Sequence, residues 1–297
     1  MRLLVTIDTE PDCDISWRRS SPLAFTSVLE GIPNILRPLW DRYDIRPIYF
    51  VSPEVVNNDD CCKTLSAEIR KGSVIGTHLH SEYLEPHITI HDPAGRVSDE
   101  FPCFAHTAEI EYAKIKNFTG LIQNKLDYRP VWYRAARYGA DIDTIRILAE
   151  LGYEYDTSVT PGIDWSGIGG PDHSRAPEQP YWIGKEDLYE VSEKDRSCGV
   201  MEYPITILGK RFGPFGGLFP DNWLFYRWLR PTHMTVFEQK RMVESLIGKY
   251  KDPVFVLIFH SMEIMINKTP FVRNRFMQKR FLNNLEAMIS HIVTREQ

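Results

Sequence analysis

The chain has 297 residues, of which 43% are hydrophobic and 25% charged, and its formal net charge is -5. These values are typical of a globular protein with a large core, and the negative charge gives no electrostatic reason to expect a nucleic acid partner. Five cysteines without a C-x-x-C pair argue against a disulfide framework or a cysteine zinc site and favour a reducing compartment. The length suits one α/β barrel, so residues 1–297 are predicted to form a single domain.

The N-terminus and the apolar segments bear on the location of the protein. Met1 leads directly into a strand-like segment without a signal-peptide pattern, and no apolar run approaches the ~20 residues of a membrane span. We therefore expect a cytoplasmic protein, for which any membrane association would be peripheral.

Strand-like and helix-like segments alternate along the chain. The first is the apolar run at 3–7, followed by helical spacing over 25–40, where Pro33 is expected to restart the helix. Further strands are predicted in "RPIYFVSP", "SVIGTHLH", "PVWYRAA", "YEYDTSV", "VMEYPITI" and "PVFVLIFH", and further helices over 60–71, 107–126, 144–151, 235–249 and 271–293. This alternation is typical of parallel βαβ units, and hence of an open α/β sheet or a barrel.

Two segments interrupt this pattern. Residues 160–188 are rich in glycine and proline, and residues 208–231 are dense in aromatic residues interleaved with arginine and lysine. Long excursions within a compact domain are usually functional loops or lids. We therefore expect loop insertions at both places.

Polar side chains cluster at the carboxyl ends of the predicted strands. They are Asp8, Glu10, His78, His80, Arg134, Asp156 and His260. In α/β barrels the active site is assembled from the strand ends on this face. Residues that are far apart in the sequence are therefore expected to converge there.

Asp8 and Glu10 are two positions apart in an extended segment, so their side chains point to the same side. Two carboxylates this close need a cation, or one of them must hold a proton. A divalent metal would supply the cation. The neighbouring Asp12 and Asp14 fit a solvated turn better.

His78 and His80 provide the imidazoles that, together with a carboxylate, form a catalytic zinc site with an open position. Glu10 offers the matching carboxylate. Glu82 is a further candidate ligand, and a hydrogen-bonded core histidine is the alternative interpretation of His78.

His260 follows six apolar residues at the exit of a predicted strand. An imidazole there can titrate near neutral pH and act as a general acid, although a hydrogen-bonded core histidine explains the position nearly as well. Arg134 keeps its charge and can form a bidentate pair with a carboxylate, for which Asp8 is the natural partner. An ordinary salt bridge is the alternative.

Five short motifs occur in order at these strand ends: "TIDTE", "GTHLH", "YRAARYG", "LGYEYDTSV" with the later "DW", and "LIFH". Together they resemble the motifs of the polysaccharide deacetylases, the NodB-homology group or carbohydrate esterase family 4, over about residues 6–263. The resemblance is to a D-x-E and H-x-H variant of that pattern. It implies a distorted (β/α) barrel of about seven or eight strands and metal-dependent hydrolysis of an N-acetyl or related amide on a sugar.

The resemblance also implies a role for each residue. Asp8 would be the catalytic base, and Arg134 would orient it. His260 would be the catalytic acid, supported by either Asp156 or Asp164. The divalent metal, zinc as the first choice, would be held by one carboxylate and two further side chains: Glu10, His78 and His80, with Glu82 as the alternative to His80. In the third motif, Ala135-Ala136-Arg137 replaces a proline and an aromatic residue that are common in the family, which alters the substrate groove more than the chemistry.

The expected partner is an N-acetylated carbohydrate, linked to a nucleotide or a lipid, in the assembly of cell-surface glycans. Residues 208–231 would then cover it with aromatic faces for sugar rings and basic groups for phosphate or an anionic membrane surface. The alternative for this segment is a packed lid whose basic residues are incidental. Three alternatives remain. They are a C–N hydrolase acting on a non-sugar amide, a non-catalytic carbohydrate-binding protein with a degenerate deacetylase site, and a glycosidase with a carboxylate pair, in which the histidines would have no role.

Overall fold

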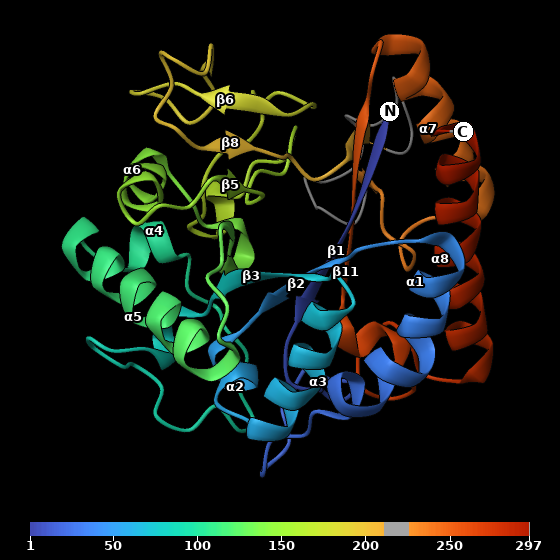
Figure 1. Ribbon diagram of the computed structural model, residues 1–297, viewed down its shortest axis with the longest axis horizontal. Coiled ribbons are helices and arrows are strands. Elements are labelled where there is room, and N and C mark those ends of the chain that lie inside the picture. Colours follow the sequence, from blue (N-terminus) through green and yellow to red (C-terminus); the bar gives the residue numbers. More distant parts are fainter. Residues whose placement is uncertain (211–225, 297) are drawn as a thin grey trace.

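The computed structural model describes residues 1–210 and 226–296, and its centre is a curved nine-stranded sheet (Figure 1). Within the described chain, seven neighbouring strands run parallel in the order β11, β1, β2, β3, β4, β5, β8, and β6 and β7 add an antiparallel edge. The bounds are β1 Arg2–Thr9, β2 Ile48–Val51, β3 Val74–Leu79, β4 Trp132–Ala135, β5 Tyr155–Asp156, β6 Tyr181–Ile183, β7 Val191–Ser192, β8 Met201–Glu202 and β11 Val254–His260. The parallel βαβ units predicted from the alternation of segments are confirmed.

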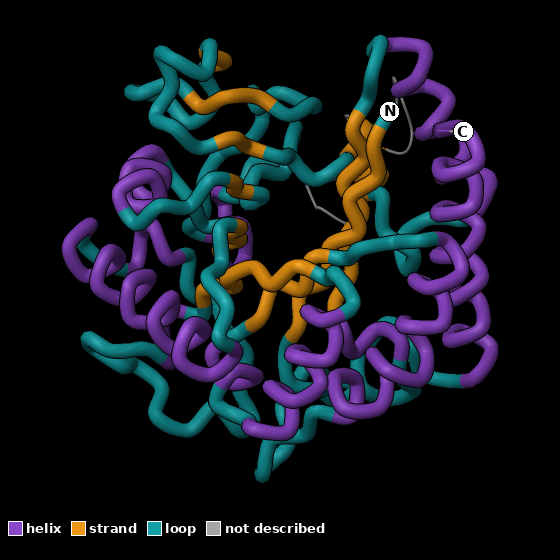
Figure 2. The backbone as a smooth tube through the Cα atoms, in the orientation of Figure 1, coloured by secondary structure: helices purple, strands orange, loops and turns teal. Residues whose placement is uncertain are grey.

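Helices surround the outside of this curved sheet (Figure 2). Their bounds are α1 Arg37–Tyr43, α2 Pro53–Val56, α3 Asp59–Arg70, α4 Pro102–Ala105, α5 Ala108–Leu126, α6 Ile142–Glu150, α7 Val236–Lys249 and α8 Arg275–Glu296. Each long helix lies within a few residues of its predicted range. Asp141 caps α6, since its carboxylate accepts hydrogen bonds from the first N–H groups of the helix.

The helix predicted over 25–40 is present, but its geometry around Pro33 differs from the prediction. Its first part is the helical segment η1 (Ser27–Leu36), which turns more widely than an α-helix, and Pro33 lies inside it. The prediction that Pro33 restarts the helix is therefore wrong. Proline lacks an N–H and its ring clashes with the regular α-helical ladder, and the wider π-type turn replaces that ladder here.

Side-chain alternation in β1 and β11 separates an outer core from the interior of the barrel. Val5 and Ile7 belong to the large apolar core between the sheet and the helices, whereas Val256 and Ile258 belong to a second cluster inside the barrel. His260 continues the inward series of β11 because successive strand residues point to opposite faces. Asp8 is paired in register with His260 on the neighbouring strand. Both side chains are therefore delivered to the same end of the barrel interior.

The structure describes all of the first predicted insertion but only the ends of the second. Residues 160–188 contain a short turn, η4 (Ser166–Ile168), and the antiparallel strand β6, and the turn contributes to the pocket described below. Of the segment 208–231, residues 211–225 lie outside the described residues. The described ends of this segment belong to β9 (Ile207–Lys210) and β10 (Tyr226–Trp228), which pair with each other. None of the described helices is long and apolar enough to cross a membrane.

Candidate active site

A cavity of about 390 Å³ opens at the carboxyl ends of the parallel strands. Its floor carries the side chains that the sequence placed at strand ends: Asp8, Glu10, His78, His80 and His260. Its walls are largely aromatic, from Trp17, Phe101, Tyr138, Trp165, Trp228 and Phe271. The cavity thus combines a polar, ionisable floor with apolar walls, the usual composition of a small-molecule site.

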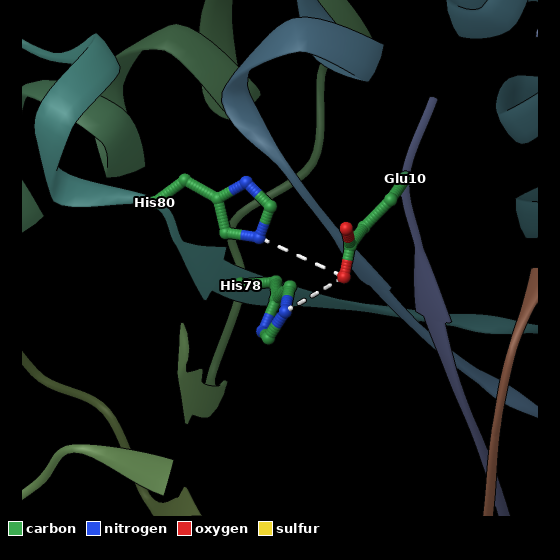
Figure 3. A group of neighbouring side chains, drawn as sticks. All are labelled: Glu10, His78 and His80. Atoms are coloured by element: carbon green, nitrogen blue, oxygen red, sulfur yellow. Dashed lines mark ion pairs between the residues drawn. The ribbon is translucent and has the colours of Figure 1, made fainter. Parts of the chain in front are cut away.

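Glu10, His78 and His80 form a compact set of potential metal ligands (Figure 3). One carboxylate oxygen of Glu10, Oε1, lies 3.3 Å from Nε2 of His78 and 3.7 Å from Nε2 of His80. One ligand atom from each of the three residues lies within 4.8 Å of the others, and all three side chains are buried. Two imidazole nitrogens and one carboxylate oxygen are a donor set suited to zinc or a related divalent ion with an open position.

The second ring nitrogen of each histidine, Nδ1, has a partner outside the set, so Nε2 is the nitrogen that faces Glu10 and would bind an ion. Nδ1 of His78 lies 3.1 Å from the carbonyl oxygen of Arg134, and Nδ1 of His80 lies 3.2 Å from a carboxylate oxygen of Glu54. Metal-binding histidines are typically oriented in this way, with the distal N–H donated to a carbonyl or a carboxylate. The residues present therefore fit a bound divalent ion.

Arg19 balances the negative charge behind this set. It forms an ion pair with Glu54 and lies 3.5 Å from Oε2 of Glu10, so the other oxygen of Glu10 is left facing the histidines. Burial opposes the charge of Glu10, but the adjacent His80 and His78 hold its pKa well below the ordinary value. Burial would likewise lower the pKa of His80, but Glu54 and Glu10 raise it to about 10, so the site stabilises positive charge between these two carboxylates.

The alternative ligand Glu82 does not belong to this set. Its carboxylate accepts a hydrogen bond from the N–H of Asp99, 3.1 Å away. β3 ends at Leu79, and the tight turn η2 (Ser81–Tyr83) that follows carries Glu82 away from the strand direction. Glu82 lines no part of the cavity, whereas His80 does.

Asp8 is held by Arg134, as the sequence predicted. The guanidinium of Arg134 lies 2.6 Å from the Asp8 carboxylate and is fixed by Thr6, by Thr157 and by the ring of Phe50 beneath it. Burial alone would raise the pKa of Asp8, but the charge of Arg134, helped by the nearby histidines, holds it below the ordinary value. Asp8 is therefore an ionised, oriented carboxylate that faces the cavity.

His260 faces the same centre from β11. Its Nε2 lies 3.8 Å from Oε1 of Glu10, and its Nδ1 lies 3.0 Å from the carboxylate of Glu263 and 2.9 Å from the guanidinium of Arg230. Glu263 and Arg230 form a buried ion pair with each other. The ring edge of His260 packs against Trp17, with centroids 5.5 Å apart.

The expectation that Asp156 or Asp164 supports His260 is wrong, because both carboxylates are engaged elsewhere. Asp156 accepts a hydrogen bond from Ser158 at 2.7 Å and is hydrogen-bonded to Glu202, and burial raises the pKa of both acids of this pair. Asp164 is exposed and accepts from the N–H of Ser166 in its own turn.

The supporting residues that sequence reasoning missed are Glu263, Arg230, Glu54 and Arg19. Only Glu263 left a local signal: it lies three residues after His260, and a single helical turn, η7 (Ser261–Ile264), brings residues at this spacing together. The others come from separate segments, and nothing near them in the sequence indicates the pairing.

No protein-family model matches this chain. No curated protein sequence matches it either. Solved structures that resemble it include a provisionally assigned polysaccharide deacetylase from Mycobacterium smegmatis, at 15% identity, 98% coverage of this chain, 84% of that chain and a TM-score of 0.53. Others are the Puue allantoinase, at 11% identity, 100% and 84% coverage and a TM-score of 0.52, and a 4-alpha-glucanotransferase from Thermococcus litoralis, at 14% identity, 99% and 38% coverage and a TM-score of 0.51.

At these identities the likeness establishes the fold, and the predicted distorted (β/α) barrel of the polysaccharide deacetylase type is confirmed. The three neighbours bear the names of three different activities. Because one fold can support many reactions, the choice among them depends on the residues of the site.

Proposed function

We propose that this protein is a metal-dependent hydrolase that removes an N-acetyl or related acyl group from a sugar or glycan precursor. The single observation that carries the proposal is one cavity that holds a Glu10–His78–His80 donor set together with Asp8 and His260. The fold shared with a provisionally assigned polysaccharide deacetylase supports it. A glycosidase would give the three imidazoles no role.

Each polar residue of the floor then has a task. A divalent ion held by Glu10, His78 and His80 would polarise the amide carbonyl and acidify the attacking water. Asp8, kept ionised by Arg134, takes the proton from that water. His260, oriented through Nδ1 by Glu263, gives a proton to the nitrogen that leaves. Amide and water thus become amine and carboxylic acid.

A second candidate keeps the chemistry and changes the substrate to a non-sugar amide. The shared fold of the Puue allantoinase favours it. The aromatic walls of the cavity favour a sugar, because sugar rings stack on aromatic faces. A nucleotide- or lipid-linked sugar, a cytoplasmic location and peripheral membrane contact are proposals that rest on the sequence alone, since most of segment 208–231 lies outside the described residues.

The metal site is tested by the zinc content of the protein as isolated. We expect one ion per chain, and Glu10→Gln and His80→Ala should weaken zinc binding by more than about 100-fold, since loss of an outer partner alone costs about 10–100-fold. Glu82→Gln is the matched control, because Glu82 is a buried acid near the site that lines no part of the cavity, and it should retain the ion. Equal zinc loss in the control, or none in the ligand variants, would refute the donor set.

The reaction is tested by acetate release from a panel of N-acetylated sugars and non-sugar amides. Asp8→Asn should bind zinc normally and lose about 10²–10⁴-fold in kcat. Asp14→Asn is the control, because Asp14 is an exposed acid of the same segment that caps its own turn. Near-normal turnover by Asp8→Asn would remove Asp8 as the base. Release only from non-sugar amides would move the assignment to the second candidate.

A further inference from the structure

Among the described residues, Arg137 and Arg230 line the cavity, and they differ in how their charges are balanced. Arg230 is buried and paired with Glu263. Arg137 makes neither an ion pair nor a hydrogen bond with the described part of the chain, and its buried Nε has no hydrogen-bond partner there. Its guanidinium lies over the ring of Phe101, 4.8 Å from the centroid. The donors of Arg137 are thus not used within the described protein.

The backbone at Arg137 has an unusual conformation. Arg137 and Tyr138 have φ angles of 54° and 63°, in the left-handed region that favours glycine. Gly139 fixes this turn, because its N–H donates to the carbonyl of Ala136 at 3.0 Å and its own carbonyl accepts from the N–H of Cys103 at 3.2 Å. Strained backbone of this kind gathers at ligand-binding sites. The fold therefore maintains an energetically unfavourable turn at the cavity wall.

Aromatic rings line the same cavity as this cation. The rings of Tyr138 and Trp165 stack 6.0 Å apart with an interplanar angle of 20°. The cavity extends from this wall to Asp8 and Glu10 on its floor. A molecule that reacts at the floor can therefore present a ring face to the aromatic wall and a substituent to Arg137.

We infer that Arg137 binds an anionic substituent, a carboxylate or a phosphate, on the substrate. The inference rests on the proposed function and deepens it, because it makes the substrate an acidic N-acyl compound. A guanidinium binds carboxylate and phosphate through paired, parallel hydrogen bonds. A neutral substrate would leave the half-buried charge of Arg137 without a counter-charge.

The test measures binding and reaction separately. Zinc-loaded Asp8→Asn protein is titrated calorimetrically with N-acetylglucosamine, its 1-phosphate and N-acetylmuramic acid, which carry no anion, a phosphate and a carboxylate respectively. The titrations are repeated with two double variants, one combining Asp8→Asn with Arg137→Gln and the other, the matched control, combining Asp8→Asn with Arg241→Gln. Arg241 is an exposed arginine that also lies over a phenylalanine ring, that of Phe237 on α7, but outside the cavity. Acetate release from the three probes is measured with the wild-type protein and with Arg137→Gln alone.

We expect at least one anionic probe to bind about tenfold or more tightly than the neutral sugar. Arg137→Gln should remove this preference without weakening the binding of the neutral sugar, and Arg241→Gln should leave the preference intact. The probe that is preferred distinguishes phosphate from carboxylate. Equal affinities, no binding by any probe, or a preference that persists in Arg137→Gln would overturn the inference.

The two proposals fail in different ways. An Arg137-dependent preference without acetate release by the wild-type protein would keep the anion site and refute the deacetylation of these sugars. Equally efficient acetate release from neutral and anionic probes, unchanged by Arg137→Gln, would keep the proposed reaction and refute the anion site.

Discussion

Lys114 is a completely buried lysine on α5 that holds the segment following His80. Its ammonium group donates hydrogen bonds to the carbonyl oxygens of Ser81 at 2.8 Å, Leu84 at 2.7 Å and His87 at 3.1 Å. All three of its N–H donors are therefore used. We predict that Lys114→Met destabilises the protein and loosens the metal site, because methionine fills similar space but can donate none of these bonds.

The magnitude follows from the three carbonyl groups. A hydrogen bond to a charged donor is worth about 1.5–3 kcal/mol. The variant also no longer buries an ammonium group, which offsets part of the loss, so we expect a net decrease of about 2–4 kcal/mol in the free energy of unfolding. The entropy of unfolding is about 2.1 cal/mol/K per residue, or about 0.6 kcal/mol/K for this chain, so Tm should fall by about 3–6 °C.

The assay is thermal unfolding followed by circular dichroism, together with zinc titration of each variant. Lys116→Met is the control, since Lys116 is an exposed lysine on the same helix and its loss should cost less than about 0.5 kcal/mol. Zinc should bind more weakly to Lys114→Met, because the backbone next to His80 is released. If Lys114→Met unfolds within about 1 °C of the control and binds zinc equally well, the three bonds do not hold the segment.

Two further predictions concern buried acids. Burial, with Asp141 and Asp143 nearby, raises the pKa of Glu111 from its ordinary 4.5 to about 8 despite a hydrogen bond from Thr144. The folded state thus binds this proton more tightly than the unfolded state does. The resulting contribution to the free energy of unfolding is fully present below about pH 4.5 and is lost as pH rises through about 8. Tm should accordingly decline less between pH 5 and 9 in Glu111→Gln than in the wild-type protein, and parallel Tm profiles would contradict this. Glu263→Gln should lower kcat about tenfold or more and leave the zinc content unchanged, because Glu263 orients His260 through Nδ1 and is not part of the metal donor set. A change confined to KM would show that Glu263 acts on binding instead.

Much of the site could be predicted because strand alternation is a local property. Asp8 and Glu10 share one side of an extended segment, so both were expected to face one cavity, and His78 and His80 were expected to converge with them at the strand ends. The convergence of the two pairs required only that β1 and β3 run parallel, with both carboxyl ends on one face. The apolar runs that predicted buried parallel strands supplied that condition.

The sequence left the choice between His80 and Glu82 open because it depends on the turn that follows β3, and the prediction for Asp156 failed because its partner depends on the order of the strands. Glu82 continues the spacing of His78 and His80, but the chain leaves β3 after Leu79 and turns Glu82 toward Asp99. Asp156 lies at a strand end as expected, yet β5 places it beside Glu202 of β8 rather than beside His260.

The sequence by itself determined which strands are buried, that strands and helices alternate in parallel units, and that polar residues gather at the strand ends. Hydrophobic periodicity and the two-residue repeat of a strand contain that information locally. The tertiary structure decided which acid supports His260, which arginine balances Glu10, and that the buried Nε of Arg137 at the cavity wall has no hydrogen-bond partner among the described residues. These relations depend on the curvature of the sheet and on the turns between its elements, which bring together residues that have no local relation in the chain.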